Sequence, residues 1–132
     1  MKQRLLLASA ILVGALITTT LVAAAIWPVI NAVETGVTAE YPELQPLYFT
    51  ADPARVFDEV QASVAAIGSF SLVEADPSER SLTATATAPV LGFIFDVTVR
   101  VEPVTEFVTR VHVRSQSRVG RGDLGQNARN VE

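Results

Sequence analysis

The chain has 132 residues, with 10 basic and 14 acidic side chains and a formal net charge of −4. Its lack of cysteine excludes a disulfide framework, a thiolate zinc site, a thiol nucleophile and a lipidated cysteine anchor. Residues 31–99 carry ten acidic and two basic side chains (−8), whereas residues 100–132 carry six arginines and four acidic side chains (+2). This division argues against a nucleic-acid-binding protein, which needs a net basic face, and allows a local anion site near the end of the chain.

The first 30 residues combine a basic start with a long uncharged run. No charged side chain occurs from Leu5 to Ile30, and this run is about 39 Å long as a helix, against a hydrocarbon core of about 30 Å. Lys2 and Arg4 would hold the N-terminus in the cytoplasm. We therefore expect residues 1–30 to form a transmembrane signal anchor that contacts the membrane through residues 5–30. A signal peptide cleaved near residues 23–25 is the alternative.

The next stretch changes from a linker to a folded domain. Residues 31–46 contain two prolines and no sustained hydrophobic period, so we expect a linker there, followed by a domain over residues 47–132. Residues 47–50 form a short strand-like run, and Asp52-Pro53 is a helix start with Asp as N-cap. Apolar side chains then recur on one helix face, which we expect to pack on the core: Val56, Phe57, Val60, Val64 and Ile67.

After Gly68 the hydrophobic period changes to two, the period of β-strands. A strand begins at Phe70, and the turn residues 76–79 predict a hairpin with the next strand. Residues 81–88 alternate threonine with small apolar residues, so the helix can pack closely on the small face. Two further alternating strands follow. We therefore expect an α+β domain of order β-α-β-β-β-β-α, with an antiparallel sheet and helices on one face.

The last two strands carry most of the charge that could have a function. Asp96 and Arg100 share a face of one strand, and Arg110, Arg114 and Arg118 share a face of the next, with His112 between the first two. Cross-strand ion pairing is the simpler interpretation, and an arginine ladder that receives an anionic group is the alternative. The single histidine lacks a nucleophile or triad partner in the sequence, so we predict no catalytic residue.

The last strand leads into a turn rich in arginine and glycine. Gly120 and Gly122 permit close approach of a ligand to the backbone, where successive N–H groups can bind an anion. Asp123, however, is placed to cap the following helix and to occupy those N–H groups itself. The carboxylates are scattered along the sequence, so we predict no metal site. The sequence matches no nucleotide-binding motif, so we predict no cofactor. The candidate anion-binding or partner-binding residues are Arg114, Arg118, Gly120, Arg121, Gly122, Asp123, Asn127 and Arg129.

The sequence resembles the domain of unknown function (DUF) family 1499 from about Leu47 to the end. The matching residues are Asp96 with the strand that follows it and, above all, residues 115–125 with Asn127 and Arg129. The resemblance implies an exported or membrane-associated bacterial protein, with the domain in the periplasm or an equivalent space next to the inner membrane. Two departures stand out: Phe95-Asp96 replaces a pair of aspartates, and the C-terminal helix expected of the family is short here.

These observations favour a membrane-anchored, exported binding or accessory module over an enzyme. Its partner would be a protein or an anionic ligand, and no nucleic acid is expected. One alternative is a hydrolase-like enzyme that uses Asp96 and His112, which requires both side chains on one face within hydrogen-bond reach. Another is a purely structural subunit of an envelope complex.

Overall fold

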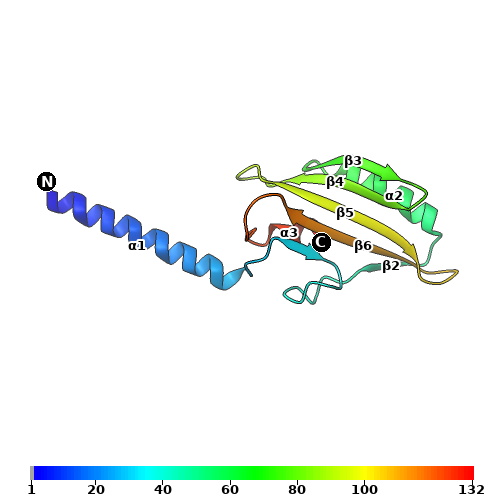
Figure 1. Cartoon of the computed structure of the whole chain (residues 1–132), viewed down its shortest axis with the longest axis horizontal. Helices are drawn as coiled ribbons and strands as arrows, with labels where there is room; N and C mark the ends of the chain where they lie inside the picture. The colour runs from blue at the N-terminus through cyan, green and yellow to red at the C-terminus, as the bar shows by residue number, and fades with distance from the viewer. Residues whose placement is uncertain (1) are drawn as a thin grey trace.

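The computed structural model describes residues 2–132 of the chain, and the side chains of residues 9–23 and 25–132. Figure 1 shows helix α1 (Lys2–Ile26) projecting from a domain that is built on one six-stranded sheet. Helices α2 (Pro53–Ala66) and α3 (Gln126–Val131) belong to this domain. The strands are β1 (Ala32–Glu34), β2 (Leu47–Phe49), β3 (Phe70–Asp76), β4 (Ser81–Thr87), β5 (Ile94–Pro103) and β6 (Thr109–Ser117).

Helix α1 lies where the sequence predicted a transmembrane signal anchor, and this prediction is corrected. In the part of the chain whose side chains are described, no helix is long and apolar enough to cross a membrane. The described apolar run of α1 before Ala24, residues 9–23, is about 22 Å long, which is less than the roughly 30 Å of a hydrocarbon core. The side chains of Lys2 and Arg4, on which the predicted orientation depended, lie outside the described residues.

The order of elements from β2 onward is the predicted β-α-β-β-β-β-α, and every strand pairing is antiparallel. The spatial order is β1-β6-β5-β4-β3, and β2 also pairs with β6. Strand β6 therefore carries β5 along one side, with β1 and β2 at different positions along the other. Helix α2 contacts β3, β4 and β5, and α3 contacts β6 and β1.

Residues 31–46, expected as a linker, are instead joined to the domain by hydrogen bonds. Strand β1 pairs with residues 114–116 of β6, and Val33 is fully buried in that pairing. Thr35 extends the contact, because its N–H donates to the carbonyl of Val113 at 3.0 Å and its hydroxyl accepts from the Val113 N–H at 3.1 Å. A strand of three residues is too short to produce a readable hydrophobic period, which is why the sequence pattern missed it.

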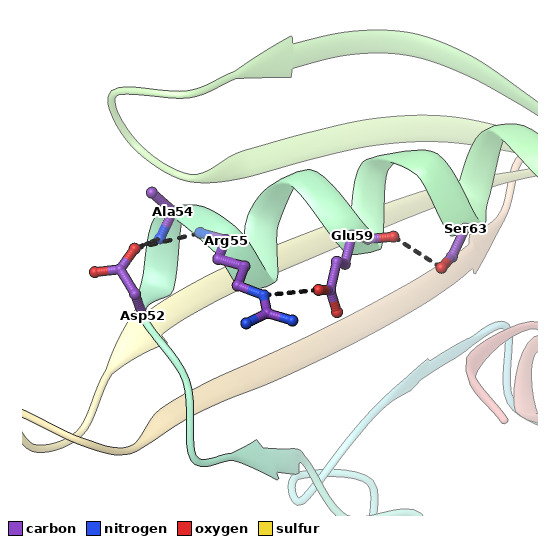
Figure 2. Close-up of polar contacts among 5 residues, drawn as sticks. All are labelled: Asp52, Ala54, Arg55, Glu59 and Ser63. Atoms are coloured by element: carbon purple, nitrogen blue, oxygen red, sulfur yellow. Dashed lines mark hydrogen bonds and ion pairs between the residues drawn. The ribbon is translucent and has the colours of Figure 1, made fainter.

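Helix α2 begins as the sequence predicted. The Asp52 carboxylate accepts hydrogen bonds from the N–H groups of Ala54 at 2.9 Å and Arg55 at 3.3 Å, as Figure 2 shows. Its exposed face carries an ion pair between Arg55 and Glu59, 3.0 Å apart. The capped first turn fixes where the helix starts, and hence which of its faces meets the sheet.

The core lies between α2 and the inner face of the sheet. Alternate residues of β5 are buried there, from Phe95 to Val101, as are Ala84 and Ala86 of β4. The small side chains of β4 let α2 approach closely, as the Thr/Ala alternation predicted, and Phe57 of α2 is 2% exposed against them. The opposite face of the sheet has no helix over it in the described part of the chain and carries the polar alternates.

We expect Phe57→Ala to lower the free energy of unfolding by about 3–5 kcal/mol, because it leaves a cavity at the centre of this core. Phe107→Ala is the matched control, since that ring is exposed in the β5–β6 loop, and it should change stability by less than about 0.5 kcal/mol. Urea unfolding followed by circular dichroism measures both. Equal effects of the two substitutions would contradict this description of the core.

Candidate functional site

The arginine–glycine turn, residues 118–125, joins β6 to α3, and Asp123 occupies its centre. The Asp123 carboxylate accepts hydrogen bonds from the N–H groups of Gly125 at 3.0 Å and Asn127 at 2.7 Å. Its carbonyl accepts from the N–H of Gln126 at 3.0 Å. The N–H groups at the start of α3 therefore face oxygen atoms of the chain itself. The sequence predicted Asp123 as the N-cap itself, but the N-cap of α3 is Gly125, and the Asp123 carboxylate caps the first turn from two residues earlier.

Helix α3 is anchored to β6 by a buried network of hydroxyl and amide groups. Asn127 is 0% exposed; its Oδ1 accepts from the Ser115 hydroxyl at 2.7 Å and its Nδ2 donates to the Ser117 hydroxyl at 3.1 Å. Asn130 adds a bond from its Nδ2 to the Ser115 hydroxyl at 3.0 Å. The inner face of β6 becomes polar towards its end because these amides cover it. Since removing one member leaves the others buried without partners, the network has a structural role.

Two glycines of the turn, Gly125 and Gly120, have positive φ angles that other residues rarely adopt. Gly125 has a φ of +75°, and a Cβ there would lie 2.5 Å from Cδ1 and 2.7 Å from Nε1 of Trp27. Gly120 has a φ of +87° but space around it. Gly122 lies against Val29, which a Cβ would meet at 3.6 Å. The turn therefore packs against the segment that follows α1.

The residues of segment 31–46 also reach this turn. Burial, and secondarily the negative charge of Asp123, raises the pKa of Tyr41 above its usual value. The Tyr41 hydroxyl is buried and has no hydrogen-bond partner among the described residues. Asp123 is thus surrounded by its own chain on several sides.

The arginines predicted as a binding site separate in the structure. Arg118 binds the Asp96 carboxylate through Nη2 at 2.7 Å and Nε at 3.1 Å. Arg129 donates to the carbonyl of Leu124 at 3.2 Å and to Gln126 Oε1 at 3.1 Å. Arg121 is exposed and has no ion pair or hydrogen bond in the described part of the chain. Arg114 lies on the open face of the sheet, where its Nε is 3.7 Å from Glu34 Oε2.

This open face holds a cavity of about 440 Å³ whose walls are mainly charged side chains. They come from three adjacent strands, β1, β6 and β5, because the two-residue period sends alternate side chains of each strand to this face. Three arginines and one histidine face two carboxylates, so the cavity has a positive balance. These six residues are Glu34, Arg100, Glu102, Arg110, His112 and Arg114.

Glu102 is the centre of charge pairing in the cavity. It binds Arg110 Nη2 at 2.8 Å, and His112 Nε2 is 3.9 Å from the same oxygen. The hydrogen bond from Arg110 is the main cause that holds the pKa of Glu102 below its usual value, and the charges of Arg110, His112 and Arg100 act in the same direction. Arg110 and Glu102 face each other directly across β5 and β6, which confirms the expected cross-strand pairing.

Arg100 is the cation with the least compensation in this cavity. Its strand partner is His112, and it forms no hydrogen bond or ion pair within the described part of the chain beyond its electrostatic effect on Glu102. Nδ1 of His112 and Nε of Arg110 are buried and also lack partners among the described residues. The cavity therefore contains the guanidinium donors of Arg100 without a carboxylate bound to them in the described part of the chain. The sequence pattern placed Arg100 on this face without showing that it would lack a carboxylate partner.

The structure does not bring together the Asp96 and His112 pair of the enzyme hypothesis. Asp96 pairs with Gln116, whereas His112 pairs with Arg100, four residues farther along β5. Both side chains lie on the open face, but this offset separates them by about 13 Å. Asp96 is also held by Arg118, whose hydrogen bonds lower the pKa of that carboxyl. Among the described residues, no group of three or more His, Asp or Glu side chains is placed to hold a metal ion.

Substitution of the two positive-φ glycines tests the contact with Trp27. Gly120→Ala should cost about 1–2 kcal/mol of stability, which is the cost of a left-handed backbone alone. Gly125→Ala should cost more and shift the fluorescence of Trp27, the only tryptophan, because the new methyl displaces its indole. Thermal unfolding and fluorescence emission measure the two effects. An identical emission spectrum in both variants would contradict the contact.

The Asp96–Arg118 pair should stabilise the fold in a pH-dependent manner. Because the folded pKa of Asp96 lies below its usual 3.8, the contribution is complete above that value and is lost as the pH falls through the folded pKa. Asp96→Asn should therefore be less stable than the natural protein at neutral pH, with a difference that shrinks below pH 3.8. Arg118→Gln should show the same profile in chemical denaturation. A difference that stays constant with pH would argue against this pair.

The comparisons with known proteins agree with the resemblance seen in the sequence. A search of curated proteins and a search of solved structures each found no match. A family model, described as "Protein of unknown function (DUF1499)", matches residues 24–132. This match includes β1 and the segment around Trp27 as well as the region from residue 47 onward. The chain, from the end of α1 through the arginine–glycine turn to α3, belongs to the DUF1499 family.

Proposed function

We propose that this domain is a non-catalytic binding module that takes an anionic group in the cavity on the open face of its sheet. The observation that carries the proposal is Arg100, which has no hydrogen bond or ion pair in the described part of the chain, beside His112 and Arg114 in a cavity of about 440 Å³. The proposal keeps the anionic ligand expected from the sequence but moves its site from the arginine–glycine turn to the sheet. Of the residues predicted from the sequence, Arg114 belongs to the proposed site.

The charges of the cavity favour an anion with two or more acceptor oxygens. Arg110 is committed to Glu102 at 2.8 Å, whereas Arg114 is 3.7 Å from Glu34, beyond hydrogen-bond distance. The guanidinium groups of Arg100 and Arg114 are therefore the ones available for a ligand. A planar guanidinium presents paired donors that match a carboxylate or a phosphate group. The shared chemistry of the ligand is an exposed carboxylate or phosphate.

The arginine–glycine turn is less suited to an external anion than the cavity, because groups of the chain itself are already bound there. Asp123 fills the position of an external anion, and Arg118 and Arg129 bind groups of the same chain. In addition, the separation of Asp96 from His112 removes the geometry on which the hydrolase alternative depended. Export of the domain to an extracytoplasmic space stays a prediction of the sequence.

Binding of inorganic phosphate and of succinate to the full chain tests the site. We expect Arg100→Gln to weaken binding by about tenfold, the loss of one charge-assisted hydrogen bond, in isothermal titration or NMR shift titration. Arg55→Gln is the matched control, because that exposed arginine lies on α2 and is paired with Glu59 (Figure 2). It should leave the affinity unchanged.

Three outcomes would overturn the proposal. The first is the absence of binding of either anion at millimolar concentration. The second is an equal loss of affinity in Arg100→Gln and Arg55→Gln, which would indicate nonspecific attraction. The third is a loss confined to the double variant Arg118→Ala with Arg121→Ala, which would place the site at the turn. Circular dichroism of each variant shows whether the fold is retained.

A further inference from the structure

Two loops lie at the end of the sheet from which α1 leaves (Figure 1). One is the β4–β5 loop, and the other is the arginine–glycine turn between β6 and α3. Together they line a cavity of about 460 Å³ with mostly apolar walls. We call this surface the apolar end and define it by Val90, Leu91, Phe93, Ile94, Val119 and Leu124.

The side chains of the apolar end are unusually exposed for their type. Val90 is 88% exposed, Leu91 66% and Val119 73%. Single exposed apolar residues are ordinary, but a contiguous cluster at two converging loops marks a contact surface. The core does not need these residues, because it closes between α2 and the inner face of the sheet. We therefore expect a partner outside the domain to cover these side chains.

The charge beside this surface indicates the chemistry of the partner that covers it. Arg121 lies in the same turn, is exposed, and forms no hydrogen bond or ion pair within the part of the chain that is described. The nearby carboxylates are already engaged, since Asp96 binds Arg118 and Asp123 caps α3. The uncompensated charge at the rim is therefore positive. An apolar surface with a basic rim is complementary to anionic lipid, where the headgroups carry the negative charge.

An exposed apolar side chain from the segment after α1 borders the arginine–glycine turn. Val29 contacts Gly122 of the turn and is itself exposed, and Ile26 at the end of the helix is also exposed. A second copy of the chain fits this surface less well. A symmetric pair would bring Arg121 towards its counterpart, and like charges would oppose the contact.

We propose that the apolar end inserts into the surface layer of an anionic lipid membrane, with Val90, Leu91 and Val119 below the headgroups and Arg121 among them. The contact lies at the lipid surface and needs no membrane-crossing helix. It is independent of the proposed anion site, which lies on the open face of the sheet. It would orient the domain with the β5–β6 loop, at the other end of the sheet, directed away from the lipid.

The absence of cysteine from the chain allows a direct test. Leu91→Cys and Val119→Cys in the full chain each take one environment-sensitive fluorophore, and vesicles of phosphatidylcholine with phosphatidylglycerol are added. We expect a blue shift of emission at both positions. Phe107→Cys is the matched control, because it is an exposed apolar position in the β5–β6 loop, and its emission should not shift.

Two further kinds of variant test the basic rim and the apolar side chains separately. Arg121→Gln should lower the affinity for anionic vesicles about fivefold and leave binding to pure phosphatidylcholine vesicles unchanged. Val90→Asp with Leu91→Asp should weaken vesicle binding, whereas Val104→Asp with Phe107→Asp should not. Because all four side chains are exposed, folding should be retained, which circular dichroism checks.

The outcomes are decisive in both directions. Unshifted emission at positions 91 and 119 on vesicles that bind the protein would overturn the proposal. So would an equal shift at position 107. A shift at position 91 that appears without lipid and grows with protein concentration would show that a second copy covers the surface instead.

Discussion

The structure depends on the pairing of β6 with three other strands. Strand β6 bonds to β5 along one edge and to β1 and β2 along the other, so it connects parts of the chain that are far apart in sequence. Its two-residue period sorts its side chains between two environments. Val111 and Ser115 face the helices, whereas Arg110 and His112 face the open side. Through this alternation β6 contributes Val111 to the core, Ser115 to the polar network, and Arg110 and His112 to the charged cavity.

The arginine–glycine turn is better understood as a structural junction than as an anion cradle. Each part of it satisfies a local requirement: Asp123 caps α3, Asn127 joins α3 to β6, and Gly125 makes room for Trp27. Such a junction tolerates few substitutions, because its polar groups are buried and two of its residues, Gly120 and Gly125, have backbone angles accessible mainly to glycine. A dense motif in a sequence can therefore reflect the demands of folding rather than those of a ligand.

The two candidate contact surfaces differ in chemistry and in position. The open-face cavity is polar, and its donors exceed its acceptors, because Arg100 has no carboxylate opposite it. The apolar end is formed by loops, which can expose large side chains because they contribute nothing to the core. A domain held at a lipid surface by its apolar end would leave the open-face cavity accessible from the side.

Much of the domain could be predicted from local patterns. The Asp52 cap, the apolar face of α2 and the alternation of β5 depend on neighbours within a few residues, and local patterns record such neighbours directly. The expected transmembrane anchor was wrong, and the expected linker proved to include β1, whose three residues are too few to show a period.

What only the tertiary structure decided are the relations between distant residues. Strand register places Arg100 opposite His112 and Asp96 four residues away from that pair. Close packing places Trp27 against Gly125. These contacts depend on hydrogen-bond pairing and close packing between segments separated by many residues, and no local pattern encodes such pairings. The sequence by itself therefore determined the elements and their faces. The folded chain decided which charges have partners and which remain available to a ligand.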